Sequence, residues 1–308
     1  MISLIKALIR PRSLTHCVLD NSPMGRLKNL LWQWGMNAER VKRQSAAKPL
    51  NSADGDAVAK LRKDGIVIGA TIDFLDAQGL SALKAGEEII RTKVASKEVQ
   101  DTLASGHKEG QHKNYLIHIV DFNETLPADH PLLGLALDER LLQIVANYMG
   151  MWPQLHAIGS WYNFPVDQDL KASQLWHRDP EDLKTVKVFI YLDDVGLKQG
   201  PFTYIPGSQP FGTDCGLRPI HKHPRRVLDA EMETAFPRSR WMDCTGKPGT
   251  MIIADTVGYH RGGQVKDGHR LLITFTYTSG VPQYKRKLGV SGIGGWAKSP
   301  IQEFALKN

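Results

Sequence analysis

Cysteine is scarce in this chain. Of its 308 residues only Cys17, Cys215 and Cys244 are cysteines, and no C-x-x-C spacing occurs among them. An odd number of widely separated cysteines is incompatible with a disulfide framework and argues against a zinc ribbon. The pattern predicts reduced thiols and a cytoplasmic location.

Long apolar runs are also lacking. No 18-residue apolar stretch occurs, so a membrane-spanning helix is not expected. At the N-terminus Lys6 and Arg10 interrupt the apolar residues, and no small-residue cleavage site follows, so the start of the chain is not a convincing signal peptide. Fixed-period repeats, low-complexity tracts and helix-turn-helix, zinc or RNP-type signatures are absent as well. Only the positive charge of the N-terminal segment favours nucleic-acid binding, so this function is not expected.

Positive charge is concentrated in residues 1–50. This segment carries nine Lys/Arg against Asp20 and Glu39, so its net charge of +7 equals that of the whole chain. Ile2, Ile5 and Ile9, and then Leu27, Leu30, Leu31 and Trp34, recur at helical spacing. Such a basic amphipathic arm can lie on an anionic membrane surface. The alternative is an extension that packs on the folded domain with its charges in water.

The rest of the chain is neutral overall, and its hydrophobic content of 42% for the whole sequence is ample for a packed core. Small polar residues predict a linker over 44–56, which separates a basic N-terminal extension (1–50) from one domain (51–308). We predict a helix end, turn and strand over 61–68, a helix over 73–91, a loop or lid over 96–113, and a helix from Pro131 to Gly150.

After Gly150 short runs of β-branched and aromatic residues alternate with turns. They predict strands over 155–163, 185–193, 202–205, 249–254 and 270–278. Helices in the first half followed by strands in the second indicate an α+β chain with an antiparallel barrel or jelly-roll core.

Histidine and aspartate form a ligand-like pattern at the start of this second half. His177 and Asp179 stand two residues apart, and residues i and i+2 of an extended segment face the same side, so the two can chelate one ion. Pro180 disfavours a helical conformation at Asp179. Two imidazoles and one carboxylate, with His260 as the third ligand, suit a non-haem Fe(II) centre that keeps one face open. For the His-x-Asp pair alone, a surface turn is the alternative.

The surrounding motifs make the pattern more specific. Their order resembles the phytanoyl-CoA dioxygenase family of Fe(II)/2-oxoglutarate oxygenases over about residues 58–280. The motifs are Trp176-His177-Arg178-Asp179-Pro180, Tyr191-Leu192-Asp193-Asp194-Val195, Gly200-Pro201 with Pro206-Gly207-Ser208-Gln209, the strand from Gly249 to Asp255, and Tyr259-His260-Arg261-Gly262 followed by Arg270.

This resemblance implies a double-stranded β-helix (a cupin-like jelly-roll barrel) with N-terminal helices packed on its outside. It implies that His177, Asp179 and His260 bind iron and act in catalysis, and that Arg270 binds the C5 carboxylate of 2-oxoglutarate. Asn163 is placed where relatives have a polar contact to the co-substrate, and Tyr191 where the pocket has a wall; a packing role is the alternative for both. The implied reaction consumes O₂ and 2-oxoglutarate and releases succinate and CO₂.

Three positions bear on the details. Gln209 replaces the histidine usual in the turn motif, a change we interpret as tolerable because the residue shapes a turn. Gly262 stands where some relatives have serine, which leaves a second donor to the C5 carboxylate open. Asp179 is retained, whereas halogenating relatives replace this carboxylate, so hydroxylation is favoured.

A basic stretch, residues 218–226, lies in the insertion before His260. It indicates capture of an anionic substrate, or else a solvated loop balanced by Asp229, Glu231 and Glu233. In this stretch His221 and His223 have the spacing of a pair of metal ligands. In the N-terminal half His112 and His118 lie where they can reach a substrate. A structural role is the alternative for all four histidines.

The sequence therefore predicts an Fe(II)/2-oxoglutarate hydroxylase of a small-molecule or lipid-linked substrate, with peripheral membrane contact through residues 1–50 as an open alternative. A relative that has lost turnover and serves as a ligand-binding or scaffold protein is the second hypothesis.

Overall fold

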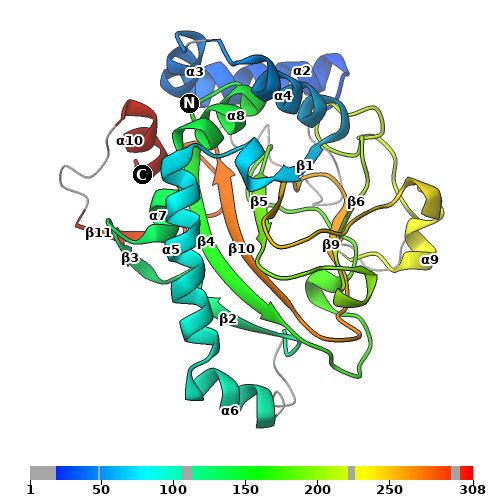
Figure 1. The fold of residues 1–308 in the computed structure, drawn as a ribbon. Helices are drawn as coiled ribbons and strands as arrows, with labels where there is room; N and C mark the ends of the chain where they lie inside the picture. Colours follow the sequence, from blue (N-terminus) through cyan, green and yellow to red (C-terminus); the bar gives the residue numbers. More distant parts are fainter. Residues whose placement is uncertain (1–18, 48, 106–112, 221–225, 293–298, 308) are drawn as a thin grey trace.

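The computed structural model describes residues 19–47, 49–105, 113–220, 226–292 and 299–307 as an α+β protein built around antiparallel sheets (Figure 1). The predictions that concern residues 1–18, His112, His221 and His223 lie outside the described residues. All five predicted strands are confirmed to within a few residues.

The large sheet has six strands in the order β1-β8-β5-β10-β4-β2, and all neighbouring strands are antiparallel. Its strands are β1 (Ile66–Ala70), β8 (Thr250–Asp255), β5 (Val186–Tyr191), β10 (Arg270–Thr278), β4 (Gln154–Asn163) and β2 (Leu116–Val120). Strand β10 is buried along its whole length because both faces of the sheet are covered.

Side chains alternate between these two faces. Leu271, Ile273 and Phe275 of β10 belong to the largest core cluster, whereas Leu272 packs in a second cluster with Phe202 and Tyr204 of β6 (Phe202–Tyr204). Strand β6 is the centre of a three-stranded antiparallel sheet that also contains β7 (Met242–Cys244) and β9 (His260–Gly262). The two sheets therefore pack face to face, with an apolar layer between them.

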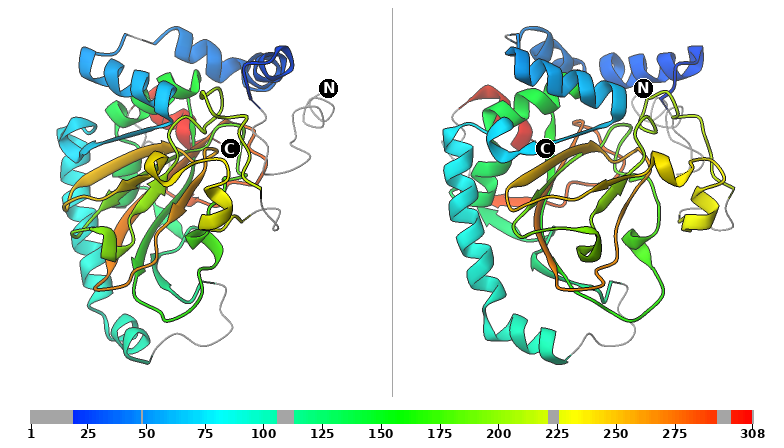
Figure 2. Two further views of the ribbon diagram at one scale, coloured as in Figure 1. Left: turned by 90° about the vertical axis from the view of Figure 1, so that its right-hand side faces the viewer. Right: turned by 45° about the vertical axis from the view of Figure 1, so that its right-hand side comes forward.

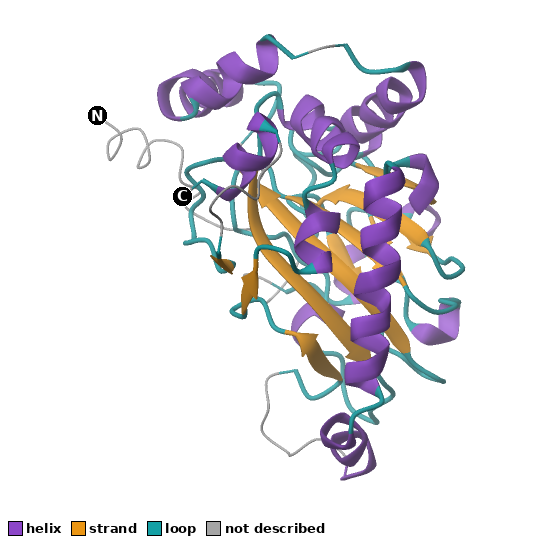
Figure 3. Cartoon of the chain, turned by 60° about the vertical axis from the view of Figure 1, so that its left-hand side comes forward, coloured by secondary structure: helices purple, strands orange, loops and turns teal. Residues whose placement is uncertain are grey.

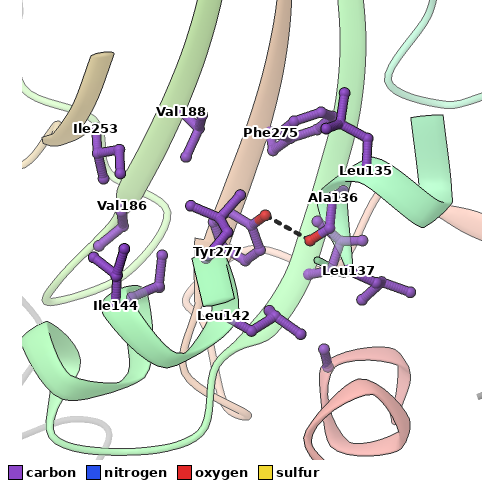
Figure 4. Packing of buried hydrophobic residues seen from close by; sticks show 14 of the residues in the cluster. Leu135, Ala136, Leu137, Leu142, Ile144, Val186, Val188, Ile253, Phe275 and Tyr277 are labelled. Carbon is purple, nitrogen blue, oxygen red and sulfur yellow. Dashed lines mark hydrogen bonds between the residues drawn. The ribbon is translucent and has the colours of Figure 1, made fainter. Parts of the chain in front are cut away.

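Helices cover the outer face of the large sheet. The long helix α5 (Ala77–Val94) runs along it, and α7 (Pro131–Ala136) and α8 (Glu139–Met149) pack beside it (Figure 3). Figure 4 shows Leu142 and Ile144 of α8 pointing at Val186 and Tyr277, whose hydroxyl donates to the Ala136 carbonyl oxygen at 2.6 Å. In Figure 2, α5 lies on one side of the strands and the short α9 (Asp229–Met232) on the other.

Smaller elements complete the structure. They are α4 (Ser52–Asp64), η2 (Thr71–Asp73), α6 (Lys97–Ser105), η3 (Ala172–Gln174), η4 (Leu197–Gln199), η5 (Arg238–Arg240), α10 (Pro300–Leu306) and the parallel pair β3 (Thr125–Pro127) and β11 (Gly289–Ser291).

Three sequence predictions are corrected. The linker predicted over 44–56 is wrong from Ser52 onward, because α4 begins there and buries Ala57, Val58 and Leu61. The loop predicted over 96–113 contains helix α6, whose Val99 is buried. The single helix predicted from Pro131 to Gly150 is two helices, because the Asp138 side chain accepts from Leu141 N–H at 2.9 Å and caps a new helix.

The N-terminal segment packs on the domain. Residues 19–47 contain α2 (Pro23–Leu30), the π-helical turn η1 (Leu31–Met36) and α3 (Ala38–Ser45), and Leu19, Trp32 and Val41 join the main core. Arg40 of α3 donates to the carbonyl oxygens of Trp152, Pro153 and Phe304 at 2.9–3.1 Å, and burial lowers its pKa to about 10. The division of the chain at residue 50 stays a prediction. None of the described helices is long and apolar enough to cross a bilayer.

Candidate metal centre and its cavity

His177, Asp179 and His260 come together between the two sheets. One ligand atom of each lies within 4.8 Å of the others. Residues 176–177 are extended, and His177 forms an antiparallel bridge with His260, each N–H donating to the other carbonyl oxygen at 3.0 Å. The Asp179 N–H donates to the Thr256 carbonyl oxygen at 2.8 Å, so the motif is extended as its spacing requires.

Backbone contacts orient both imidazoles. His177 Nδ1 lies 2.8 Å from the Leu175 carbonyl oxygen, and His260 Nδ1 lies 3.0 Å from that of Gly258. Because a carbonyl oxygen only accepts, each Nδ1 carries the proton and each Nε2 keeps its lone pair. Burial lowers the pKa of both histidines, which keeps the rings neutral.

The Nε2 atoms face the Asp179 carboxylate. His177 Nε2 lies 3.7 Å from Oδ1, and His260 Nε2 lies 3.5 Å from Oδ2. Two donors that hold one ion at right angles, each at about 2.1 Å, lie about 3 Å apart. The three groups would need to move only slightly closer to hold one ion, and the donor set of two imidazoles and one carboxylate fits non-haem iron.

A buried ion pair holds Asp179. Lys187 Nζ lies 2.7 Å from Asp179 Oδ2 and 3.6 Å from Glu181 Oε1, and all three side chains are less than one-fifth exposed. Burial by itself raises the pKa of Asp179, but the neighbouring Lys187 ammonium opposes this effect, and the pKa lies well below its usual value. Asp179 is therefore a carboxylate at neutral pH.

The cluster lies in a cavity of about 180 Å³ between the sheets. Arg270 and Leu272 of β10, Trp161 and Asn163 of β4, and Lys187 and Phe189 of β5 are spaced two residues apart and so point to this inner face. The other lining residues are Lys113, Leu116, Phe122, Ser173, His177, Asp179, Glu181, Phe202, Arg226, His260, Gly262 and Lys287.

Arg270 is a second buried cation of this cavity, besides Lys187. It is directly opposite Asn163 in the β10–β4 register, so the two side chains share a face. Its Nη1 donates to the Gly263 carbonyl oxygen at 3.4 Å, while Nε has no acceptor and no Asp or Glu of the described segments pairs with it. Asn163 Oδ1 also lacks a partner. A buried guanidinium in this state fits a carboxylate ligand, which accepts two parallel hydrogen bonds.

Tyr191 has a different environment. Its hydroxyl donates to the Cys244 carbonyl oxygen at 2.9 Å and accepts from Phe202 N–H at 3.1 Å, and the side chain is fully buried. It is not among the residues that line the cavity. These contacts are those of a packing residue that joins the two sheets. Gln209, whose amide donates to the Arg62 and Lys63 carbonyl oxygens, likewise fixes the turn after β6 to the end of α4.

Several lining residues were missed by the sequence interpretation. Lys187 could have been recognised from the sequence, because it is the one charged residue in an otherwise apolar strand, Val186–Tyr191. Ser173, whose hydroxyl is 2.7 Å from that of Tyr115, could not be recognised from the sequence. It reaches the cavity because its turn lies close to Gly262. Of the basic stretch 218–226, Arg226 lines the cavity, and Asp229 forms an ion pair with Arg261.

Comparisons with known proteins agree with this geometry. The family model described as "Phytanoyl-CoA dioxygenase (PhyH)" matches residues 61–270, which include every residue of the cluster and Arg270. No curated protein sequence gives a significant match. A solved structure of the epimerase SnoN in complex with Fe³⁺, alpha ketoglutarate and nogalamycin RO is similar with a TM-score of 0.52 at 17% identity, over 81% of this chain and 91% of that chain. A structure of EctD from S. alaskensis with 2-oxoglutarate and 5-hydroxyectoine has a TM-score of 0.49 at 20% identity, over 76% of this chain and 79% of that chain. At 17% identity the likeness to SnoN is one of fold alone.

Proposed function

This chain belongs to the phytanoyl-CoA dioxygenase family, and from that membership we propose that it is a non-haem Fe(II)/2-oxoglutarate-dependent dioxygenase. In this proposal it hydroxylates a small-molecule or lipid-linked substrate, which carries an anionic group, and releases succinate and CO₂. The observation that carries the proposal is the presence, in one cavity, of a His-Asp-His cluster and of a buried arginine that pairs with no carboxylate of the described residues.

The proposed ligands of the iron are His177, Asp179 and His260. Iron, when bound, supplies the activation of O₂ that is coupled to oxidative decarboxylation of 2-oxoglutarate. The chain itself orients both imidazoles through Nδ1–H and keeps Asp179 ionised through Lys187.

The proposed co-substrate residues are Arg270 and Asn163. Arg270 offers parallel donors to the C5 carboxylate, and Asn163 lies opposite it on the same face, where its amide N–H groups can donate to the co-substrate. Apolar side chains of Phe189, Phe202 and Leu272 exclude water from the reacting groups. Tyr191 supports this wall from behind.

The architecture supports the proposal. We infer that the large sheet and the sheet β7-β6-β9 are the two halves of a double-stranded β-helix, because their inner faces share one apolar cluster with the metal ligands beside it. Retention of Asp179 favours hydroxylation over halogenation, since no ligand position is left open for a halide.

The direct test is O₂-dependent succinate release from 2-oxoglutarate by the Fe(II)-loaded full-length chain, with and without candidate substrates. Because the SnoN structure is that of an epimerase, product analysis by mass spectrometry must look for a gain of one oxygen atom. The alternative, a catalytically silent ligand-binding or scaffold protein, predicts ligand binding with no succinate formed under any condition.

Peripheral membrane contact is a second proposal, for a protein located in the cytoplasm. Met24, Leu27, Leu30 and Trp34 are each about half exposed and follow one another at helical spacing, with Arg26 and Lys28 between them. An apolar stripe with basic flanks fits an anionic lipid surface. Deleting residues 1–50 would remove the buried Arg40, so the sharper test is flotation with phosphatidylserine vesicles of full-length protein and of a Leu27→Glu/Leu30→Glu variant. Equal flotation of the two would reject this contact.

A further inference from the structure

We propose that the cavity contains a separate anion-binding subsite, in which Lys113 and Lys287 hold a carboxylate or phosphate group of the substrate over an aromatic pair. The assignment of this group to the substrate rests on the proposed function; the existence of the subsite does not. The lysines come from two distant segments, one just before β2 and the other just before β11.

The aromatic pair is formed by Phe122 and Trp161. Their ring centroids are 5.4 Å apart with an interplanar angle of 88°, an edge-to-face contact that fixes both rings. Lys113 Nζ lies 5.8 Å from the Trp161 ring centroid, and Lys287 Nζ lies 5.5 Å from that of Phe122. The two ammonium groups are thus held beside adjacent rings on the wall of the same cavity.

Neither lysine contacts a carboxylate of the described residues. Among these residues Asp179 and Glu181 are the carboxylates that line the cavity, and Lys187 contacts both, while Asp121 is near enough to Lys287 for their charges to interact. Within the described ranges neither Lys113 nor Lys287 forms an ion pair, and Arg226 adds a further cation to the lining. Burial lowers the pKa of Lys113, and the charges of Lys187, Arg226 and Lys287 lower it further, whereas the charge of Asp179 raises it. A bound anion would relieve this repulsion.

A third donor lies beside the lysines. The Trp161 indole Nε1 is shielded from solvent and has no hydrogen-bond acceptor in the described parts of the chain. A buried N–H without a partner is costly, so an oxygen of a ligand is the complementary group. Two ammonium groups, an indole N–H and two ring surfaces together fit a molecule that joins an oxyanion to an apolar or planar body.

The experiment uses the full-length chain without iron or 2-oxoglutarate. Calorimetric titration with phenyl phosphate, phenylacetate and the neutral benzyl alcohol compares wild type with Lys113→Ala, Lys287→Ala and Lys285→Ala. Lys285 lies two residues from Lys287 and is exposed, as Lys287 is, but it does not line the cavity, so its variant is the matched control.

We expect at least one anionic probe to bind wild type more tightly than benzyl alcohol does. Each of the two cavity variants should weaken that probe by about tenfold, the effect of one charge-assisted hydrogen bond. The Lys285→Ala variant should bind like wild type, and the relative strength of the two anionic probes tells phosphate from carboxylate. Equal binding of anionic and neutral probes, or equal loss in the Lys285→Ala control, overturns the inference.

Repeating the titration with 2-oxoglutarate present separates this subsite from the co-substrate site. Unchanged phenyl phosphate binding supports a separate subsite, whereas competition places the lysines in the co-substrate site and overturns the inference. The two proposals fail in different ways. If no succinate is released, the enzymatic function is rejected, but the binding of the anionic probes still supports the subsite. If succinate is released but anionic and neutral probes bind equally, only the subsite is rejected.

Discussion

Lys187 is predicted to stabilise the metal-free protein by neutralising Asp179. Its ammonium lies 2.7 Å from Asp179 Oδ2 and 3.6 Å from Glu181 Oε1, at 13% exposure of the side chain. The substitution Lys187→Met keeps the apolar stem and removes the ammonium group that contacts both buried carboxylates. Breaking a buried pair in this way costs about 3–5 kcal/mol.

Thermal unfolding of the metal-free protein measures this cost. At roughly 2 °C per kcal/mol for a large domain, the Tm should fall by about 6–10 °C. Fe(II) bound at the cluster supplies positive charge beside Asp179, so adding Fe(II) anaerobically should raise the Tm more in the variant than in wild type. A Lys187→Met/Glu181→Gln double variant should regain part of the loss, because one of the two carboxylates is then neutral.

The matched control is Lys184→Met. Lys184 is a buried lysine close in sequence to Lys187, but it donates to the Tyr148 carbonyl oxygen and lies over that ring, not beside Asp179. Its variant should show the same Fe(II)-induced rise as wild type. An unchanged Tm in Lys187→Met, or the same Fe(II)-induced rise in all three proteins, would refute the reasoning.

Four further outcomes are expected. His260→Ala should lower iron retention on the order of 100-fold or more and abolish turnover, with an unchanged circular dichroism spectrum; normal iron content would remove His260 from the site. Arg270→Lys should raise the 2-oxoglutarate concentration needed for succinate release by roughly 100-fold or more, since one partner of a buried charge pair is replaced by a poorer one. Gly262→Ser should fold and need no more 2-oxoglutarate than Gly262→Ala, because a Cβ there lies 3.4 Å from Arg270 Nη2, an ordinary contact, and the hydroxyl adds a donor. Burial raises the pKa of Asp138 from 3.8 to about 7, so the fold favours its protonated form; this stabilisation is complete below about pH 4 and is lost as the pH rises through 7. Urea midpoints from pH 4 to 8 should therefore fall less in Asp138→Asn, and parallel profiles would contradict this.

Strands and the metal cluster were predictable because local rules determine them. The alternation in 270–278 requires an extended segment with two buried faces, and β10 has that form. His177 and Asp179 face one side because the segment is extended, and the order of motifs up to Arg270 placed His260 beside them.

Features set by tertiary contacts were not predictable in this way. Residues 52–56 have the composition of a polar linker, but they begin α4, where Asp54 forms an ion pair at 2.8 Å with Arg140 of a helix far along the chain. The pairing of Asn163 with Arg270 depends on strand register, which the sequence pattern alone does not give. Lys113 and Lys287 meet the same aromatic pair from segments that have no pattern in common.

The central claim is that one cavity binds Fe(II) and 2-oxoglutarate together. Anaerobic titration of the Fe(II)-loaded full-length chain with 2-oxoglutarate, followed by visible absorption of the iron–oxo-acid chelate, tests it most directly. The account predicts a new absorption band that saturates at one equivalent in wild type, requires much more 2-oxoglutarate in Arg270→Lys, and is absent in His260→Ala. No band in wild type, or the same band in all three proteins, would contradict it.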